Sequence, residues 1–182
     1  TTVLFKMGLK NVFLQGPQRL RPGPNMVGFA YTLRYIPARE DLDRIEAFED
    51  QSNPQRKGVE ECPEGAVFVI DARSDARAAS AGAILATRLQ QRGCAGLVTD
   101  GGFRDAPEIA ALDMPSYHRR PSAPTNLTRH HAVAINDPIA CGEVSVFPGD
   151  ILVGDGEGVV CIPRHLAEEV ASAAYEMTVF ED

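Results

Sequence analysis

An adjacent arginine and aspartate, Arg104 and Asp105, are the first candidates for chemistry in this sequence. They follow a short apolar run, residues 95–98, and the pair Gly101 and Gly102. Open α/β sheets place ligand sites just beyond the carboxyl ends of their strands, and glycines there let the backbone approach a ligand closely. The arginine fork could bind a carboxylate through two parallel hydrogen bonds, and the aspartate could hold a hard cation such as Mg²⁺.

Asp105 also has a structural explanation. It stands three residues before Glu108, with Pro107 between them, which matches a helix N-cap with proline in the first turn. N-cap aspartates are common, so on sequence grounds a capping role is the more frequent explanation. Capping and ligand binding do not exclude each other, and both interpretations stay open at this point.

A second candidate is the segment Gly82, Ala83, Ile84 and Leu85. A glycine inside a helix costs about 1 kcal/mol relative to alanine, so Gly82 could instead mark a helix start or a close approach of backbone to a ligand. Free amides at a helix start could bind an anionic group. Packing of small residues between a helix and a sheet explains the segment equally well.

Several other kinds of site are not indicated. The three lysines, Lys6, Lys10 and Lys57, lie in terminal or loop-like segments, whereas imine-forming catalysis needs a desolvated lysine. The glycine-rich residues 154–158 lie between two strand-like runs and predict a hairpin turn, not a nucleotide loop. The four histidines lack metal-ligand spacing, and the four scattered cysteines predict reduced, buried thiols. With the imine route closed, a metal cation is the available electron sink.

Composition narrows the class of protein. The 182 residues carry 25 acidic and 18 basic side chains, a net charge of -7, which gives no cationic surface for nucleic acid or anionic lipid. No apolar run approaches the ~20 residues of a membrane span. We therefore expect no nucleic-acid or membrane partner and a cytoplasmic protein. We also expect one domain over residues 1–182, of which residues 1–25 are less regular.

The apolar pattern predicts the elements that position the candidates. Helices are expected at 41–50, at 75–92 with Gly93 as its end, from Asp105 to about 112, and after Pro163. The polar segment 51–64 is expected to be a surface connection. Strands are expected at 26–36, 66–70, 95–98, 127–136, 144–147, 151–153 and 159–162. Two strand–helix steps followed by hairpin strands predict an α/β fold, a layered domain of mixed sheets with flanking helices.

The spacing of the two candidate segments resembles a known family. Gly82 to Leu85, then eighteen residues, then Arg104 and Asp105 within T-D-G-G-F-R-D, is similar to the RraA-like family, which includes 4-hydroxy-4-methyl-2-oxoglutarate aldolases. Residues 148–150 and 158–163 resemble that family's C-terminal strands. The resemblance covers about residues 26–170. It implies a swivelling β/β/α domain, a homotrimer or a hexamer, and active sites in clefts between subunits.

The resemblance also implies roles for individual residues. In the aldolase members the matching arginine binds the carboxylate of a pyruvate-like portion, the matching aspartate binds a divalent metal cation (Mg²⁺ or Mn²⁺), and backbone amides of the glycine segment contact substrate. Carried over, these roles fall on Arg104, on Asp105 and on Gly82, Ala83, Ile84 and Leu85. The implied activity is pyruvate release from a small 2-oxo acid, by aldol cleavage or oxaloacetate decarboxylation. The alternative is a non-catalytic regulator that binds a ribonuclease, as the family's namesake does.

One position departs from the family's pattern. Many aldolase members have an acidic residue directly after the motif glycine, whereas this chain has Ala83. A carboxylate that a neighbouring subunit supplies near its C-terminus has no residue-by-residue match here. The general base is therefore unassigned. Asp100 lies close in sequence, and a role in stabilising its loop explains it equally well.

Overall fold

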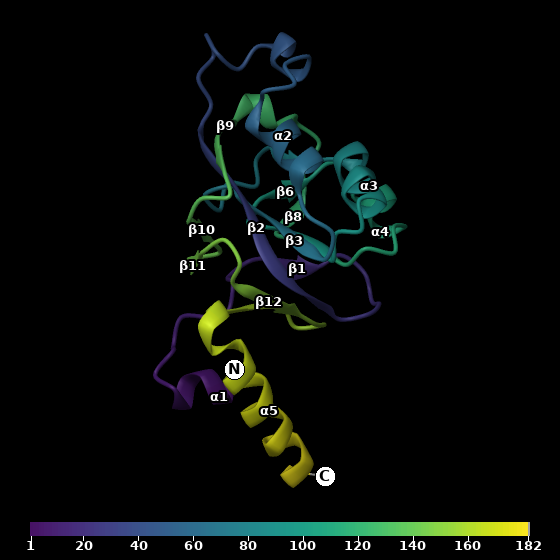
Figure 1. The fold of residues 1–182 in the computed structure, drawn as a ribbon. Coiled ribbons are helices and arrows are strands. Elements are labelled where there is room, and N and C mark those ends of the chain that lie inside the picture. Colours follow the sequence, from purple (N-terminus) through teal and green to yellow (C-terminus); the bar gives the residue numbers. More distant parts are fainter. Residues whose placement is uncertain (182) are drawn as a thin grey trace.

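The computed structural model describes residues 1–181, and its central element is a mixed eight-stranded sheet (Figure 1). Four neighbouring strands are parallel, so their carboxyl ends meet at one edge of the sheet. They are, in spatial order, β7 (Ser116–His118), β5 (Gly96–Thr99), β3 (Ala66–Asp71) and β2 (Met26–Pro37). The antiparallel strands are β1 (Gln18–Arg19) beside β7, β9 (His130–Ile135) and β12 (Ile151–Gly154) beside β2, and β13 (Val159–Ile162) beside β12.

Both faces of this sheet are covered, which gives three layers in the order β/β/α. The helices on one face are α2 (Pro54–Glu61), α3 (Ala83–Gln91) and α4 (Ala106–Ala110), and a hairpin of β10 (Ile139–Cys141) and β11 (Val144–Val146) lies on the other (Figure 1). On β3, Phe68 and Ile70 are buried against the helices, and Val67 and Val69 are buried on the opposite face. Burial of each such side chain contributes about 1.5–3 kcal/mol.

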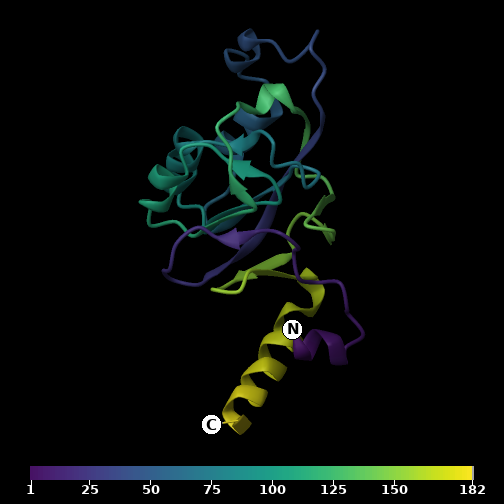
Figure 2. The same ribbon diagram turned by 180° about the vertical axis from the view of Figure 1, so that it is seen from behind.

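The two terminal helices lie together beyond β12. Figure 2 shows α5 projecting from the sheet with α1 beside its first turns, and Val3, Leu4 and Val170 form a small buried cluster between them. The bounds are α1 (Thr2–Lys6) and α5 (Ala167–Glu181), and three short 3₁₀ turns are η1 (Ile45–Phe48), η2 (Asn126–Thr128) and η3 (Arg164–Leu166). Within residues 1–181, no helix combines the length and apolar character needed to cross a bilayer.

A small three-stranded parallel sheet lies beyond the carboxyl ends of the central strands. Its members, β4 (Ala79–Ala81), β6 (Gly102–Phe103) and β8 (Arg120–Pro121), follow β3, β5 and β7 respectively along the chain. Close packing around this small sheet requires glycine at positions 101 and 102. A Cβ at Gly101 would lie 2.6 Å from the Cβ of Ala72, and one at Gly102 would lie 2.7 Å from the Cβ of Ser122.

Most of the predicted strands are confirmed. The predictions at 26–36, 66–70 and 95–98 correspond to β2, β3 and β5, and the hairpin turn at 154–158 connects the antiparallel strands β12 and β13. All four cysteines are buried, as predicted. The layered α/β fold class is confirmed as well.

The helix predicted at 75–92 is wrong in its first half. Only Ala83–Gln91 is helical, and residues 79–81 form β4 instead. Tertiary contacts explain the difference. β4 pairs with β6, and the Tyr35 hydroxyl and the Gln55 side-chain amide donate hydrogen bonds to the Ser80 carbonyl. Gly82 therefore marks a helix start, which was one of the two interpretations of that glycine.

Two further predictions, for residues 41–50 and 51–64, need correction. Residues 51–64 are not simply a surface connection, because they contain α2, whose Asn53 side chain accepts a hydrogen bond from the Gln55 amide with Pro54 at the first helical position. The helix predicted at 41–50 is only the 3₁₀ turn Ile45–Phe48. There the Asp43 carboxylate accepts hydrogen bonds from the Arg39 amide and the His131 ring, and these contacts compete with helical hydrogen bonding.

Candidate active site

The carboxylate of Asp105 faces the start of α3 and not its own helix. Asp105 precedes α4 with left-handed backbone angles, φ 57° and ψ 39°, and its side chain makes no hydrogen bond to the amides of α4, all of which are described. Its Oδ2 instead lies 3.4 Å from the Ala83 amide nitrogen and 3.4 Å from Arg104 Nε. Asp105 thus occupies the predicted N-cap position of α4, but the predicted capping by its side chain is wrong. Both contacts are long, so the carboxylate keeps capacity to bind a further group.

The pairing of β4 with β6 brings the two candidate segments together. Ala81 lies opposite Phe103 in this pair, and the Arg104 amide donates to the Ala81 carbonyl at 3.0 Å. Gly82 is consequently in contact with both charged side chains. A Cβ on Gly82 would lie 3.2 Å from Asp105 Oδ2 and 3.5 Å from Arg104 Nε. The absence of a side chain at this position therefore lets the charged pair approach the helix start.

The first turn of α3 presents free backbone amides to this site. Gly82 is the N-cap residue and supplies no side-chain cap, and the Asp105 carboxylate contacts the Ala83 amide at the long distance of 3.4 Å. The first hydrogen bond within the helix runs from the Ala86 amide to the Gly82 carbonyl, so the amides of Ala83, Ile84 and Leu85 have no partner inside the helix. Such amides, together with the helix dipole, favour a bound anion.

A cavity of about 350 Å³ lies beside this helix start and includes Gly82, Ile84, Leu85 and Arg104. Its size is within the range of small-molecule sites. The remaining lining residues come from α2, η1, η2 and β4: Phe48, Gln55, Arg56, Ala79, Ala81, Thr125 and Asn126. Arg104 lines the cavity, whereas Ala83 and Asp105 do not; the side chains of Arg104 and Asp105 are 45% and 37% exposed, so both are accessible from solvent. A wider cleft of about 1100 Å³ between α2 and α3 shares Arg56, Ile84 and Leu85 with this cavity.

The sequence analysis missed the contribution of α2 and η2. Gln55 is buried and donates from Nε2 to the Ser80 carbonyl at 2.8 Å, and Asn126 Nδ2 donates to Gln55 Oε1 at 3.2 Å. These bonds form a polar wall of the cavity that no motif of the sequence had indicated. The signal that could have found it is Asn53-Pro54, a helix start that would have placed the next residues on an ordered element.

Asp100 stabilises its loop and does not face the cavity. It is buried, and its carboxylate accepts hydrogen bonds from the amides of Ala72, Ser74 and Gly142 at 2.7, 2.8 and 3.3 Å. Of the two explanations that the sequence left open for Asp100, the loop-stabilising one is therefore confirmed.

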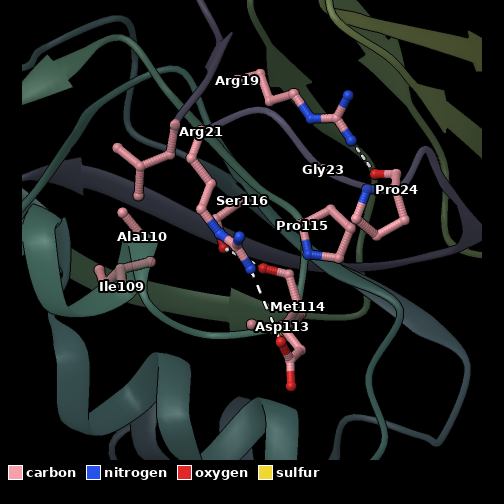
Figure 3. Close-up of a pocket in the computed structure, with 11 residues that line it drawn as sticks. Arg19, Arg21, Gly23, Pro24, Ile109, Ala110, Asp113, Met114, Pro115 and Ser116 are labelled. Atoms are coloured by element: carbon pink, nitrogen blue, oxygen red, sulfur yellow. Dashed lines mark hydrogen bonds and ion pairs between the residues drawn. The ribbon is translucent and has the colours of Figure 1, made fainter.

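A second hollow, near Arg21 and Asp113, is too small to bind a substrate (Figure 3). Its volume is about 10 Å³, roughly the space of one water molecule. Arg21 closes it with an ion pair to Asp113 at 3.8 Å and a hydrogen bond to the Leu112 carbonyl. The cavity beside Arg104 is the better candidate.

The donor set at Asp105 fits a cation that keeps much of its water. Within residues 1–181, no three histidine, cysteine, aspartate or glutamate side chains lie close enough to form a metal cage. Mg²⁺ is usually held by one or two carboxylates, with water and substrate oxygens completing its octahedron. The single, partly exposed carboxylate of Asp105 is compatible with that mode. His130 and His131, which are neighbours in the sequence, are not available as metal ligands. His130 is buried, and the His131 ring forms a hydrogen bond with Asp43 at 2.8 Å.

The fold and this site define a three-layer β/β/α protein with a small-ligand pocket beside an arginine–aspartate pair. The chain belongs to the RraA-like family, because the family model described as Aldolase/RraA matches residues 4–161.

Curated relatives carry aldolase names. The chain is 37% identical over 118 residues to a Halalkalibacterium halodurans protein named "Putative 4-hydroxy-4-methyl-2-oxoglutarate aldolase", a match that covers 65% of this chain and 56% of that protein. It is 32% identical over 104 residues to a protein of the same name from Ectopseudomonas mendocina, covering 57% of this chain and 64% of that protein. The chain thus spans just over half of the first relative's length.

Solved structures share the fold. Streptomyces coelicolor RraAS2, described as an unusual member of the RNase ES inhibitor RraA protein family, superimposes with a TM-score of 0.88 at 29% identity, over 99% of this chain and 86% of that one. The RNA-processing inhibitor RraA from Thermus gives a TM-score of 0.68 at 24% identity, over 90% of this chain and 92% of that one. The second likeness concerns the fold alone.

Proposed function

We propose that this protein is a divalent-metal-dependent lyase that releases pyruvate from a small 2-oxo acid. The reaction is aldol cleavage of a 4-hydroxy-4-methyl-2-oxoglutarate-type substrate, decarboxylation of oxaloacetate, or both. The observation that carries the proposal is the Asp105 carboxylate, which turns away from its own helix toward Arg104 and the start of α3. The family membership and the names of the curated relatives support it.

The residues of the site have separate tasks. Arg104, whose fork matches a carboxylate, binds the C1 carboxylate of the substrate, and the free amides of Ile84 and Leu85 orient it. Asp105, with Gly82 giving it room, holds the divalent cation (Mg²⁺ or Mn²⁺). When bound, the cation would supply a positive charge that stabilises the negative charge developing on the 2-oxo group.

The bond changes are those of a retro-aldol cleavage. The C3–C4 bond breaks, its electron pair is delocalised from C3 onto the 2-oxo oxygen, and the C4 hydroxyl loses its proton as a carbonyl forms. Protonation of C3 then completes pyruvate. None of the described cavity-lining residues carries a carboxylate, so the acceptor of the hydroxyl proton lies outside that set. In oxaloacetate the departing group is carbon dioxide, and no hydroxyl proton has to be removed.

A pyruvate-release assay tests the proposal. The chain is incubated with 4-hydroxy-4-methyl-2-oxoglutarate or oxaloacetate, with Mg²⁺ or Mn²⁺ and separately with EDTA, and spontaneous decarboxylation is subtracted. We expect metal-dependent pyruvate release that EDTA removes. Arg104→Lys, which keeps the charge and loses the fork, should retain only a small part of the activity. Turnover that persists in EDTA would contradict a metal-dependent reaction.

The working assembly is proposed to be a homotrimer or a hexamer. The support is the exposed apolar surface of α5, where the side chains of Tyr175, Val179 and Phe180 are 72%, 58% and 91% exposed on a helix that projects from the domain (Figure 2). Contact between copies would remove this surface from water. Light scattering of the purified chain measures the assembly directly.

The second candidate function is a non-catalytic regulator that binds a ribonuclease. The likeness to Streptomyces coelicolor RraAS2 over 99% of this chain favours it. The acidic net charge of -7 suits docking on a basic protein segment. Pull-down of an endoribonuclease by the wild type and equally by Arg104→Ala, combined with no pyruvate release, would favour this function over the lyase.

A further inference from the structure

A second arginine lines the same cavity as Arg104. Arg56 lies in the first turn of α2, which is firmly packed on the sheet. Val59 of that helix is buried, and a Cβ on Gly58 would lie only 3.0 Å from the Ile135 side chain and 3.1 Å from the Phe68 ring. The backbone that carries Arg56 is therefore held in place beside the cavity that this side chain lines.

The guanidinium of Arg56 has donors to spare. Its Nη1 donates to the Phe48 carbonyl, which orients the group. A guanidinium has five N–H donors, so most remain available. Within residues 1–181, no carboxylate lies within ion-pair distance of Arg56. Asp50 and Glu60, the carboxylates whose charges interact with Arg56, have other hydrogen-bond partners. Asp50 accepts hydrogen bonds from Ser52, and Glu60 accepts one from Arg88.

The cavity thus offers two cationic forks and no carboxylate of its own among the described residues. The same cavity is lined by the apolar side chains of Phe48, Ile84 and Leu85, and by the polar wall formed by Gln55 and Asn126. A ligand with one carboxylate satisfies one fork only. A ligand with a carboxylate at each end satisfies both, and charge-assisted arginine–carboxylate bonds are among the stronger polar contacts.

We infer that Arg56 is a specificity-determining residue that binds the second carboxylate of a dicarboxylic 2-oxo acid, while Arg104 binds the first. The inference rests on the proposed function, because it takes Arg104 as the site of the C1 carboxylate. Arg56 touches no reacting bond in this arrangement. Its role is to select substrates that end in a carboxylate over those that end in a methyl group.

The test uses two uncleaved keto acids of equal chain length. In the presence of Mg²⁺, calorimetric titration measures the affinities for 2-oxoglutarate, which ends in a carboxylate, and 2-oxopentanoate, which ends in a methyl group. Because Arg56 is solvent-exposed, we expect a preference for 2-oxoglutarate at the low end of charge-assisted bonds, about tenfold. Arg56→Gln should reduce that preference to within about twofold, with the affinity for 2-oxopentanoate unchanged.

Matched variants separate the possible results. Arg44→Gln removes an exposed arginine that does not line the cavity and should keep the wild-type preference. Arg56→Lys, for use if Arg56→Gln is unstable in a thermal melt, keeps the charge and should keep part of the preference. Equal affinity of the wild type for both keto acids, or a tenfold preference that survives Arg56→Gln, overturns the inference while leaving the lyase proposal standing. If neither keto acid binds, the proposed function fails and the inference fails with it.

Discussion

Asp105 has a strained backbone conformation that its side chain does not offset. A non-glycine residue in the left-handed region costs of order 1–3 kcal/mol, although aspartate and asparagine tolerate it better than most. Within the described chain, the carboxylate makes no capping hydrogen bond to α4 that would offset this strain. Backbone strain that no such bond offsets is typical of residues in ligand sites.

Variants of Asp105 should therefore separate stability from activity. Asp105→Asn and Asp105→Gly both tolerate left-handed angles, so the free energy of unfolding should stay within about 1 kcal/mol of the wild type. Pyruvate release should fall by about a hundredfold or more, because Asp105→Asn replaces the charged ligand of the cation with a neutral oxygen and Asp105→Gly removes the ligand. Urea unfolding and the coupled assay measure the two quantities. Loss of several kcal/mol of stability with parallel loss of activity would indicate a structural role instead.

At this scale the sequence predicted the charged pair but not its surroundings. Arg104, Asp105 and Gly82 could be selected because a glycine pair and an adjacent arginine–aspartate follow a buried apolar run. The cap signature around Asp105 gave the wrong role, because a local pattern does not report that the backbone enters the left-handed region. Gln55 could not be selected, since its position depends on hydrogen bonds with Ser80 and Asn126, 25 and 71 positions away. Arg56 could not be selected because its place at the cavity depends on how α2 packs.

At the scale of elements, the register between β4 and β6 sets the site. It places Gly82, at the start of α3, against Arg104 and Asp105, more than 20 residues later in the chain. The sequence predicted the helix and the central strand, since both have clear apolar periodicity. It did not predict β4, because a three-residue strand is defined by its partner and not by its own pattern.

A methyl group at the start of α3 should disturb the pair without unfolding the protein. At φ -130° the backbone of Gly82 suits alanine, but the new Cβ would lie 3.2 Å from Asp105 Oδ2. We expect Gly82→Ala to lower pyruvate release by about tenfold with little change in thermal stability, since an ångström-scale misplacement can cost as much or more. Gly156→Ala is the control, because a Cβ there would meet no described atom within 4 Å. Full activity of Gly82→Ala would show that the close approach is not needed.

At the scale of the whole molecule, the layers explain why the site lies where it does. Parallel strands β3, β5 and β7 end at one edge, and the short sheet β4-β6-β8 continues beyond them toward the helices. Apolar strands followed by helical segments along the chain made this architecture predictable. The position of α2 was not predictable in the same way, because a polar, proline-containing segment resembles a loop until its buried face is seen.

The buried histidines make global stability depend on pH. Burial lowers the pKa of His118, stacked on Phe103 at 5.0 Å, to about 4. The unfolded chain therefore binds a proton below about pH 6.5 that the folded chain does not bind, so stability is lost as pH falls from about 6.5 toward 4. Burial also lowers the pKa of His130, which adds in the same direction.

Replacement of His118 should reduce this acid sensitivity. His118→Phe keeps the ring stack, removes a buried nitrogen that has no described partner, and eliminates the linked proton. We expect the loss of unfolding free energy between pH 6.5 and 4 to shrink by about 2 kcal/mol. Urea unfolding across this pH range measures it, with the exposed His165→Phe as the control. An unchanged slope would mean that His118 is protonated in the folded state.

The joint hold of Arg104 and Asp105 on a cation and a keto acid is measured most directly by pyruvate binding with and without Mn²⁺. Calorimetric titration of the wild type should show pyruvate affinity at least about tenfold higher with Mn²⁺ than with EDTA. Asp105→Asn should abolish the metal effect, and Arg104→Gln should weaken binding under both conditions. Pyruvate affinity that is the same in Mn²⁺ and EDTA, and unchanged in both variants, would contradict the account.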